Sequence, residues 1–182
     1  MPVINATIDG VAVEIEEGCT GLQHYASRSD VVAMAVDGQA WDLSREIPSG
    51  AAVEAITLNS PAGLEILRHS CTHVMAQAVQ EVFPDVNLGI GPFITDGFYY
   101  DFGNIDSVTP ELMRDLEKRM KRIVKEGQTF RRRVVSEDEA REELADQPYK
   151  LELITTKGGG AEDASVEVGG SELTIYDNVR RD

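Results

Sequence analysis

The chain has 182 residues, of which 42% are hydrophobic and 27% are charged, a composition that allows a buried core in one ordinary domain or two small ones. Its formal net charge of −15 argues against nonspecific nucleic-acid binding by the chain as a whole. The sequence contains neither a secretion-type leader nor an apolar run of about 18 residues, so no membrane partner is indicated and a cytoplasmic location is expected.

Residues 1–60 are predicted to form a small sheet with one helix packed on it. Two Asp-Gly pairs, at residues 9–10 and 37–38, lie between β-prone segments and predict tight hairpin turns. A short helix is expected near residues 21–26. The predicted strands span residues 3–8, 11–15, 31–36, 39–43 and 53–58.

Residues 61–182 mix helices and strands without a βαβ rhythm, so the fold class is predicted to be α+β. Ser60 and Pro61 are typical of a helix start, and Pro84 of its end. The other predicted helices span residues 109–127 and 136–145. The predicted strands comprise two short ones within residues 86–102, then 129–135, 149–155 and a hairpin of 165–168 with 172–176, after a loop at 158–160.

The charge is unevenly distributed, because the stretch from Arg114 to Arg133 carries nine basic and three acidic residues. Two interpretations remain open. The stretch could attract phosphate, in which case Arg131, Arg132 and Arg133 are expected to contact a nucleic-acid backbone. Alternatively, it could be a solvated helix stabilised by ion pairs between residues four apart.

His69 and His73 are four apart in a predicted helix, so their imidazoles share one face. As metal ligands they would supply half of a zinc site, but Cys71 faces the other way and His24 is the only other histidine, so no metal site is expected in this chain. As acid–base or hydrogen-bonding groups they need no metal, and an ordinary pKa near 6.5 suits proton transfer near neutrality. A third interpretation is that both are structural.

Smaller motifs have simpler interpretations. Gly89-x-Gly91 lacks the surroundings of a phosphate loop and predicts a tight turn. Trp41 and Phe130 are interpreted as core residues rather than base-stacking platforms. Cys19 and Cys71 are too few for a disulfide framework and are expected to be free thiols.

Residues 68–79 and 88–102, with the paired histidines in the first and the Gly-Phe-Tyr-Tyr-Asp-Phe run in the second, closely resemble the editing domain of bacterial-type threonyl-tRNA synthetases. Residues 116–120, 132–136, 139–141 and 148–154 also fit that family. Residues 1–60 resemble its TGS domain, a ubiquitin-like β-grasp, although the region at 20–30 is shorter than expected. The resemblance therefore implies a TGS domain at 1–60 and an editing domain at 61–182 that is truncated at its C-terminal end.

The resemblance also implies roles for individual residues. His69, His73 and Lys150 fall on catalytic positions and Tyr100 on a substrate-binding position of a pocket that removes wrongly attached serine from tRNA(Thr). Lys150 fits stabilisation of the oxyanion, and a histidine fits positioning of the water. Tyr100 could fix the ribose or the amino acid. We expect the four residues to face one solvent-accessible cleft.

The parent enzyme is expected to join threonine to tRNA(Thr) with ATP and Mg²⁺, to hold zinc in its core and to be a homodimer through domains absent here. This piece is expected to be inactive in aminoacylation and incomplete for editing of seryl-tRNA, because the Asp-x-Cys-Arg-Gly-Pro-His segment that follows in the family is missing. Two alternatives are a TGS-containing regulatory or RNA-binding module and a free-standing alanyl-type trans-editing protein. His69, His73 and Lys150 argue against the first. The TGS-like region and the incomplete metal site argue against the second.

Overall fold

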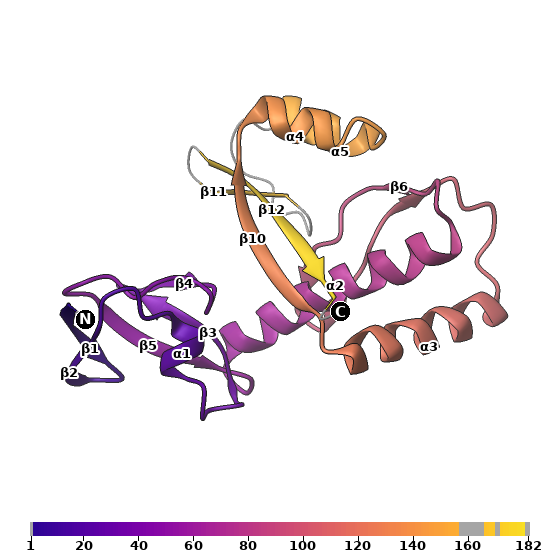
Figure 1. The fold of residues 1–182 in the computed structure, drawn as a ribbon. Coiled ribbons are helices and arrows are strands. Elements are labelled where there is room, and N and C mark those ends of the chain that lie inside the picture. Colours follow the sequence, from indigo (N-terminus) through magenta and orange to yellow (C-terminus); the bar gives the residue numbers. More distant parts are fainter. Residues whose placement is uncertain (1, 157–165, 170–171, 181–182) are drawn as a thin grey trace. The chain divides into compact units, whose positions relative to one another are not determined.

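The computed structural model describes residues 2–156, 166–169 and 172–180 of the chain (Figure 1). The chain forms two compact units, Met1–Leu67 and Arg68–Asp182. Both contain helices and strands, and the first has a mixed sheet, so the α+β class is confirmed.

The first unit is a five-stranded sheet in the order β2-β1-β5-β3-β4, in which β1 and β5 run parallel and the other neighbours antiparallel. Both predicted hairpins are confirmed. Asp9-Gly10 and Asp37-Gly38 have positive φ values at both positions, as a two-residue turn matched to the strand twist requires. The strands are β1 Val3–Ile8, β2 Val11–Glu16, β3 Val31–Val36, β4 Gln39–Trp41 and β5 Ala52–Thr57.

A short helix, α1 (Gly21–His24), follows β2 and confirms the helix predicted there. Thr20 and Gln23 form a capping box at its start, which supplies acceptors for backbone N–H groups that the helix itself leaves unbonded. Met34 and Val53 are 0% and 1% exposed in the core of this unit. Trp41 is half-buried and packs against that core, in agreement with its interpretation as a core residue.

Two long helices dominate the second unit. Helix α2 (Pro61–Val82) begins in the first unit, where Ser60 Oγ accepts a hydrogen bond from the Gly63 N–H at 3.0 Å, and it ends before Pro84 as predicted. Helix α3 (Pro110–Glu126) starts at the Thr109 cap and ends at Gly127, whose φ of 61° is left-handed. Both predicted helices are confirmed.

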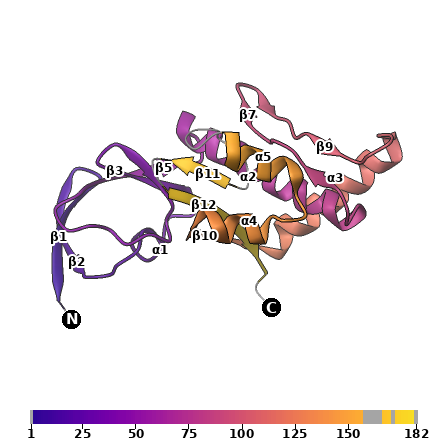
Figure 2. The same cartoon turned by 90° about the horizontal axis from the view of Figure 1, so that it is seen from above.

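Helices α2 and α3 pack side by side (Figures 1 and 2). Ile123 of α3 is 1% exposed and contacts a cluster that includes Val74 and Ala78 of α2. Burial of such aliphatic surface is the main term that holds the pair together. No helix among the described residues is both long enough and apolar enough to cross a membrane.

A three-stranded antiparallel sheet in the order β10-β12-β11 completes the unit. Its strands are β10 Thr129–Val135, β11 Val166–Gly169 and β12 Glu172–Val179. The strand at 129–135 and the hairpin of β11 with β12 are confirmed, and β12 also pairs with β10 along seven residue pairs. The loop predicted at residues 158–160 lies outside the described residues.

The strand predicted at 149–155 is wrong, because this segment is helix α5 (Pro148–Thr156). The buried residues Lys150 and Ile154 are four apart and therefore lie on one helical face. Pro148 at the first position has no N–H to satisfy, so it favours a helix start.

The remaining elements are short. The capping box of Ser136 and Glu139 opens α4 (Glu137–Glu143), as predicted. Residues 86–103 form two strand pairs rather than one, because four two-residue strands replace the two that were expected. These are β6 Asn87–Leu88 with β9 Phe102–Gly103, and β7 Phe93–Ile94 with β8 Gly97–Phe98.

Candidate functional site

One face of α2 carries His69, His73 and Gln77, which are successively four residues apart. The two imidazole rings meet edge to face, with their centroids 5.2 Å apart. The Asn178 side-chain amide of β12 donates to Gln77 Oε1 at 2.5 Å. The histidine-bearing face of α2 therefore lies against the sheet of β10 and β12.

The His73 ring is enclosed by aromatic side chains from that sheet. Its centroid lies 5.4 Å from that of Phe130 and 6.2 Å from that of Tyr176. Burial, followed by the neighbouring charges of His69 and Lys150, lowers the pKa of His73 to about 3. The ordinary pKa assumed from the sequence does not apply, and His73 is neutral throughout the physiological range.

Lys150 reaches this region from α5 and is 1% exposed. Its ammonium nitrogen lies 5.8 Å from the centroid of the Tyr100 ring, where a cation is attracted by the aromatic face. Gln147, just before α5, accepts from the Leu88 N–H at 2.8 Å and donates to the Val86 carbonyl at 3.3 Å. These two bonds fix the start of α5 against the chain that leads to Gly89.

Tyr100 is held in place by close packing on both sides. Its ring stacks on Phe102 with centroids 4.6 Å apart and an interplanar angle of 12°. A Cβ atom on Gly91 would lie 2.3 Å from Tyr100 Cδ2, and one on Gly89 would lie 2.7 Å from the Asp101 carbonyl oxygen. The predicted tight turn at Gly89-x-Gly91 is therefore wrong, since these glycines instead let two chain segments approach closely.

Two ring contacts join the residues singled out from the sequence in pairs, His69 with His73 and Lys150 with Tyr100, and the charge of Lys150 acts on His73. The expected exposure differs, because Lys150 is buried rather than open to a cleft. A hollow of about 370 Å³ is lined by residues that neighbour Tyr100 and Lys150 in the sequence, and none of the histidines is among its described lining residues. It is lined by Gly89, Ile90, Asp101, Phe102, Gly103, Tyr149, Glu152 and Leu153.

No metal centre is evident at these residues. Within residues 2–156, 166–169 and 172–180, no three His, Cys, Asp or Glu side chains group closely enough to hold an ion. Cys71, on the same helix as His69 and His73, is a free thiol whose pKa is raised by burial.

The basic stretch from Arg114 to Arg133 largely follows the ion-pair interpretation. Lys121 pairs with Glu117 at 2.6 Å on α3. On β10, Arg131 and Arg133 both bind Asp177 of β12, at 3.1 and 2.6 Å, so they join the two strands. Two of the three arginines expected to meet phosphate are therefore neutralised internally.

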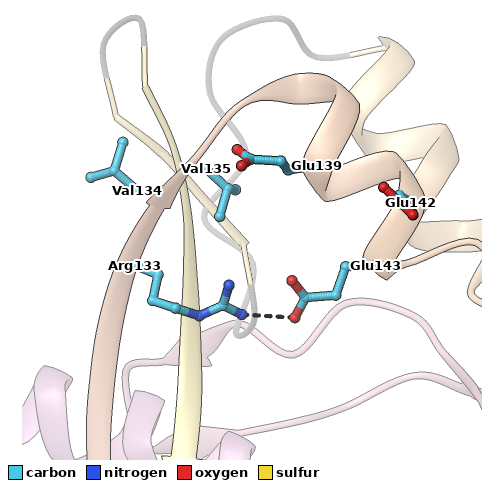
Figure 3. A pocket seen from close by; sticks show the side chains of 6 residues that line it. All are labelled: Arg133, Val134, Val135, Glu139, Glu142 and Glu143. Atoms are coloured by element: carbon cyan, nitrogen blue, oxygen red, sulfur yellow. Dashed lines mark hydrogen bonds and ion pairs between the residues drawn. The ribbon is translucent and has the colours of Figure 1, made fainter.

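Arg133 also contacts Glu143 of α4 at 2.7 Å (Figure 3). These two residues border a hollow of about 590 Å³, which Figure 3 shows between the strands and α4. Its lining carries three glutamates and one arginine, so this face is acidic. It contains no aromatic ring or amide of the kind that would orient an organic ligand.

Sequence reasoning missed two neighbours of the histidines, Tyr176 and Asn178. Phe130 was correctly interpreted as a core residue, but its contact with the His73 ring was not foreseen. The missing information was the register, which places Phe130 opposite Asn178 and Arg132 opposite Tyr176. Because side chains alternate along a strand, these four share the face turned to α2.

Comparison with known proteins identifies many relatives of one kind. The chain is 68% identical to a "Threonine--tRNA ligase" of Cutibacterium acnes over 168 residues, which are 92% of this chain and 25% of that protein. It is 54% identical to the protein of that name from Micrococcus luteus, over 96% of this chain and 26% of the relative. It is 50% identical to that of Thermobifida fusca, over 98% of this chain and 28% of the relative. The chain thus spans about a quarter of the length of these relatives. No protein-family model matches it.

Proposed function

We propose that this chain, a homologue of the N-terminal region of threonine--tRNA ligases, contributes the editing of mischarged seryl-tRNA(Thr) to such an enzyme. The observation that carries the proposal is the meeting of His69, His73, Tyr100 and Lys150 from three separate parts of the second unit. A pair of histidines beside a buried lysine and a tyrosine has the groups that ester hydrolysis needs without a metal.

The assignment of residues 1–60 to a TGS domain is part of the proposal. The strand order β2-β1-β5-β3-β4, with a parallel central pair and a helix between β2 and β3, supports it because ubiquitin-like β-grasp domains share this arrangement. Residues 61–182 are then the editing domain. The helix that carries the histidines begins at the boundary between them.

Editing is needed because binding alone discriminates poorly between threonine and serine. Serine lacks one methyl group of threonine, and a contact of that size discriminates by only about 1–3 kcal/mol. The aminoacylation site, which accepts threonine, therefore also accepts some serine. A second, hydrolytic site has to remove it from the tRNA.

The residues can be given roles in that hydrolysis. Water attacks the ester carbonyl carbon, the bond from this carbon to the ribose oxygen breaks, and the proton lost by the water ends on that oxygen. With a pKa of about 3, His73 is a weak base, so its role is to orient the water as a neutral hydrogen-bonding group. Lys150 stabilises the oxyanion and Tyr100 positions the ribose or the amino acid.

The joining of threonine to tRNA(Thr) is proposed for regions of the ligase outside these 182 residues. ATP, Mg²⁺ and zinc are assigned to the same regions, and so are the contacts of a homodimer. We therefore expect the 182-residue chain to show no threonine-dependent exchange of pyrophosphate into ATP. Threonine-dependent pyrophosphate exchange by the pure chain would contradict the assignment of aminoacylation to other regions of the ligase.

The test uses the ligase that carries this region, with His73→Asn and Lys150→Met as separate variants. Each should slow deacylation of seryl-tRNA(Thr) by a factor on the order of 10²–10⁴, because water placement or oxyanion stabilisation is lost. Threonylation should persist, since it is proposed for another domain. His24→Asn in the first unit is the matched control.

Circular dichroism of each variant separates a lost function from a lost fold. If folded variants clear seryl-tRNA as fast as the unchanged enzyme, the editing assignment fails. Retention of tRNA binding in that case would favour an RNA-binding module instead.

A further inference from the structure

A second concave surface of the second unit is basic rather than acidic. It is a hollow of about 560 Å³ formed where the end of α2, the middle of α3 and the residue after β12 meet. Of the described residues that line it, four out of five are cations, and none of these five is aromatic or aliphatic. The lining consists of Glu81, Lys118, Arg119, Arg122 and Arg180.

Glu81 holds the arginines of this hollow in position. Its carboxylate accepts from Arg119 at 3.3 Å, pairs closely with Arg122 and lies 3.8 Å from Arg180. Only 20% of the Glu81 side chain is exposed, so this anchor is largely shielded from solvent. One carboxylate thus organises three guanidinium groups. Asp115 pairs with Arg119 and Glu126 with Arg122, so three carboxylates of the described residues face four cations and one positive charge is in excess.

Several donors of the hollow remain available. Arg119 uses Nε for Asp115 and Nη1 for Glu81, and Arg122 uses Nη1 for Glu126 and Nη2 for Glu81. A guanidinium has five N–H donors, so each of these arginines can donate to a further oxygen atom. Lys118 is exposed, and no carboxylate of the described residues forms an ion pair with it.

The cations of the hollow and the arginines of β10 differ in how they are paired with carboxylates, and this difference indicates which part of the basic stretch attracts phosphate. Arg131 and Arg133 share Asp177, and Arg133 also pairs with Glu143, so these two cations face two carboxylates. In the hollow, Lys118 forms no ion pair with a carboxylate of the described residues. Arg180 belongs to this group although it lies far from the basic stretch in sequence. The expected phosphate contacts therefore shift from the arginine triplet to α3.

We propose that this hollow binds backbone phosphate of tRNA, a step that rests on the proposed function because it names how the substrate is held. Guanidinium and ammonium groups match phosphate oxygens in charge and hydrogen-bond geometry. Arg and Lys side chains supply many of the contacts that proteins make to phosphate, so a lining dominated by them favours recognition of the backbone. The site acts independently of the residues around His73.

The test measures binding of uncharged tRNA to the 182-residue chain between 50 and 200 mM salt. Lys118→Gln with Arg180→Gln removes two cations at the rim and leaves Arg119 and Arg122 on Glu81. If each cation releases counterions from one phosphate, each contributes about 0.9 to the salt slope. Over this fourfold change in salt, the double variant should therefore lose about 12-fold less affinity than the unchanged chain.

Lys125→Gln is the matched control, since Lys125 is an exposed lysine on the same helix but outside the hollow. Glu81→Gln provides a change of opposite sign. It removes the anion that competes with phosphate, so tRNA should bind more tightly, which loss of a merely structural contact would not produce. Circular dichroism checks that each variant is folded.

Three results would overturn the inference. One is no tRNA binding by the unchanged chain at 50 mM salt, and another is an equal effect of Lys125→Gln. The third is inorganic phosphate or ATP binding as tightly as tRNA at the same residues, which would indicate a small-anion site. Uncharged tRNA has no ester to hydrolyse, so this test can fail while the editing proposal stands, and the reverse also holds.

Discussion

The neutral state of His73 makes the stability of the second unit depend on pH. Burial and the charges of His69 and Lys150 lower its pKa from 6.5 to about 3 in the folded chain. Between these values the unfolded chain binds a proton that the folded chain excludes, so this stabilisation is complete above pH 6.5 and is lost as the pH falls towards 3. Lowering the pH from 7 to 5 should cost about 2 kcal/mol through this group alone.

The assay is urea unfolding at pH 7 and at pH 5, monitored by the circular dichroism of the helices. His73→Asn has no titrating imidazole, so its free energy of unfolding should fall by about 2 kcal/mol less than that of the unchanged chain over the same interval. His24→Asn reports the effect of removing an imidazole elsewhere in the chain. Trp41 fluorescence follows the first unit in the same samples.

The decisive measurement is direct titration of the His73 ring by nuclear magnetic resonance. Its nitrogen signals should remain those of a neutral imidazole at pH 5. A ring that is protonated at pH 5 would refute the argument from burial, and the proposal that His73 orients the water as a neutral group would fail with it.

Three further changes test the packing around the site. Ile123→Ala should cost about 2–5 kcal/mol in urea unfolding, because it leaves a cavity between α3 and α2, and a smaller loss would show that the helices close the gap. Gly91→Ala should cost about 1–3 kcal/mol and move the Tyr100 ring, whereas Gly97→Ala, which meets nothing within 4 Å, should stay within about 0.5 kcal/mol. Ser136→Ala should cost about 1 kcal/mol, since it removes the cap of α4, and an unchanged urea midpoint would contradict that role.

Local chemistry explains what could be predicted from the sequence. Asp-Gly turns, the Ser60 and Thr109 caps and Gly127 act within a few residues of themselves, so their effects can be recognised without knowing the rest of the fold. The spacing of His69 and His73 is equally local, and their rings do meet. The strand prediction at 149–155 failed because the segment is short. In a short segment, only the elements packed against it decide which residues are buried.

The surroundings of the histidines depend on register instead, which no short pattern contains. Tyr176 reaches His73 because β12 pairs with β10 at Arg132, and a shift of one residue would turn it to the opposite face. The same pairing sets Asp177 against Arg131 and Arg133, two of the three arginines for which the sequence had left phosphate contact open. The register between β10 and β12 thus both encloses the His73 ring and pairs Arg131 and Arg133 of β10 with a carboxylate. The cations proposed to meet phosphate are instead Lys118, Arg119 and Arg122 of α3 and Arg180 after β12.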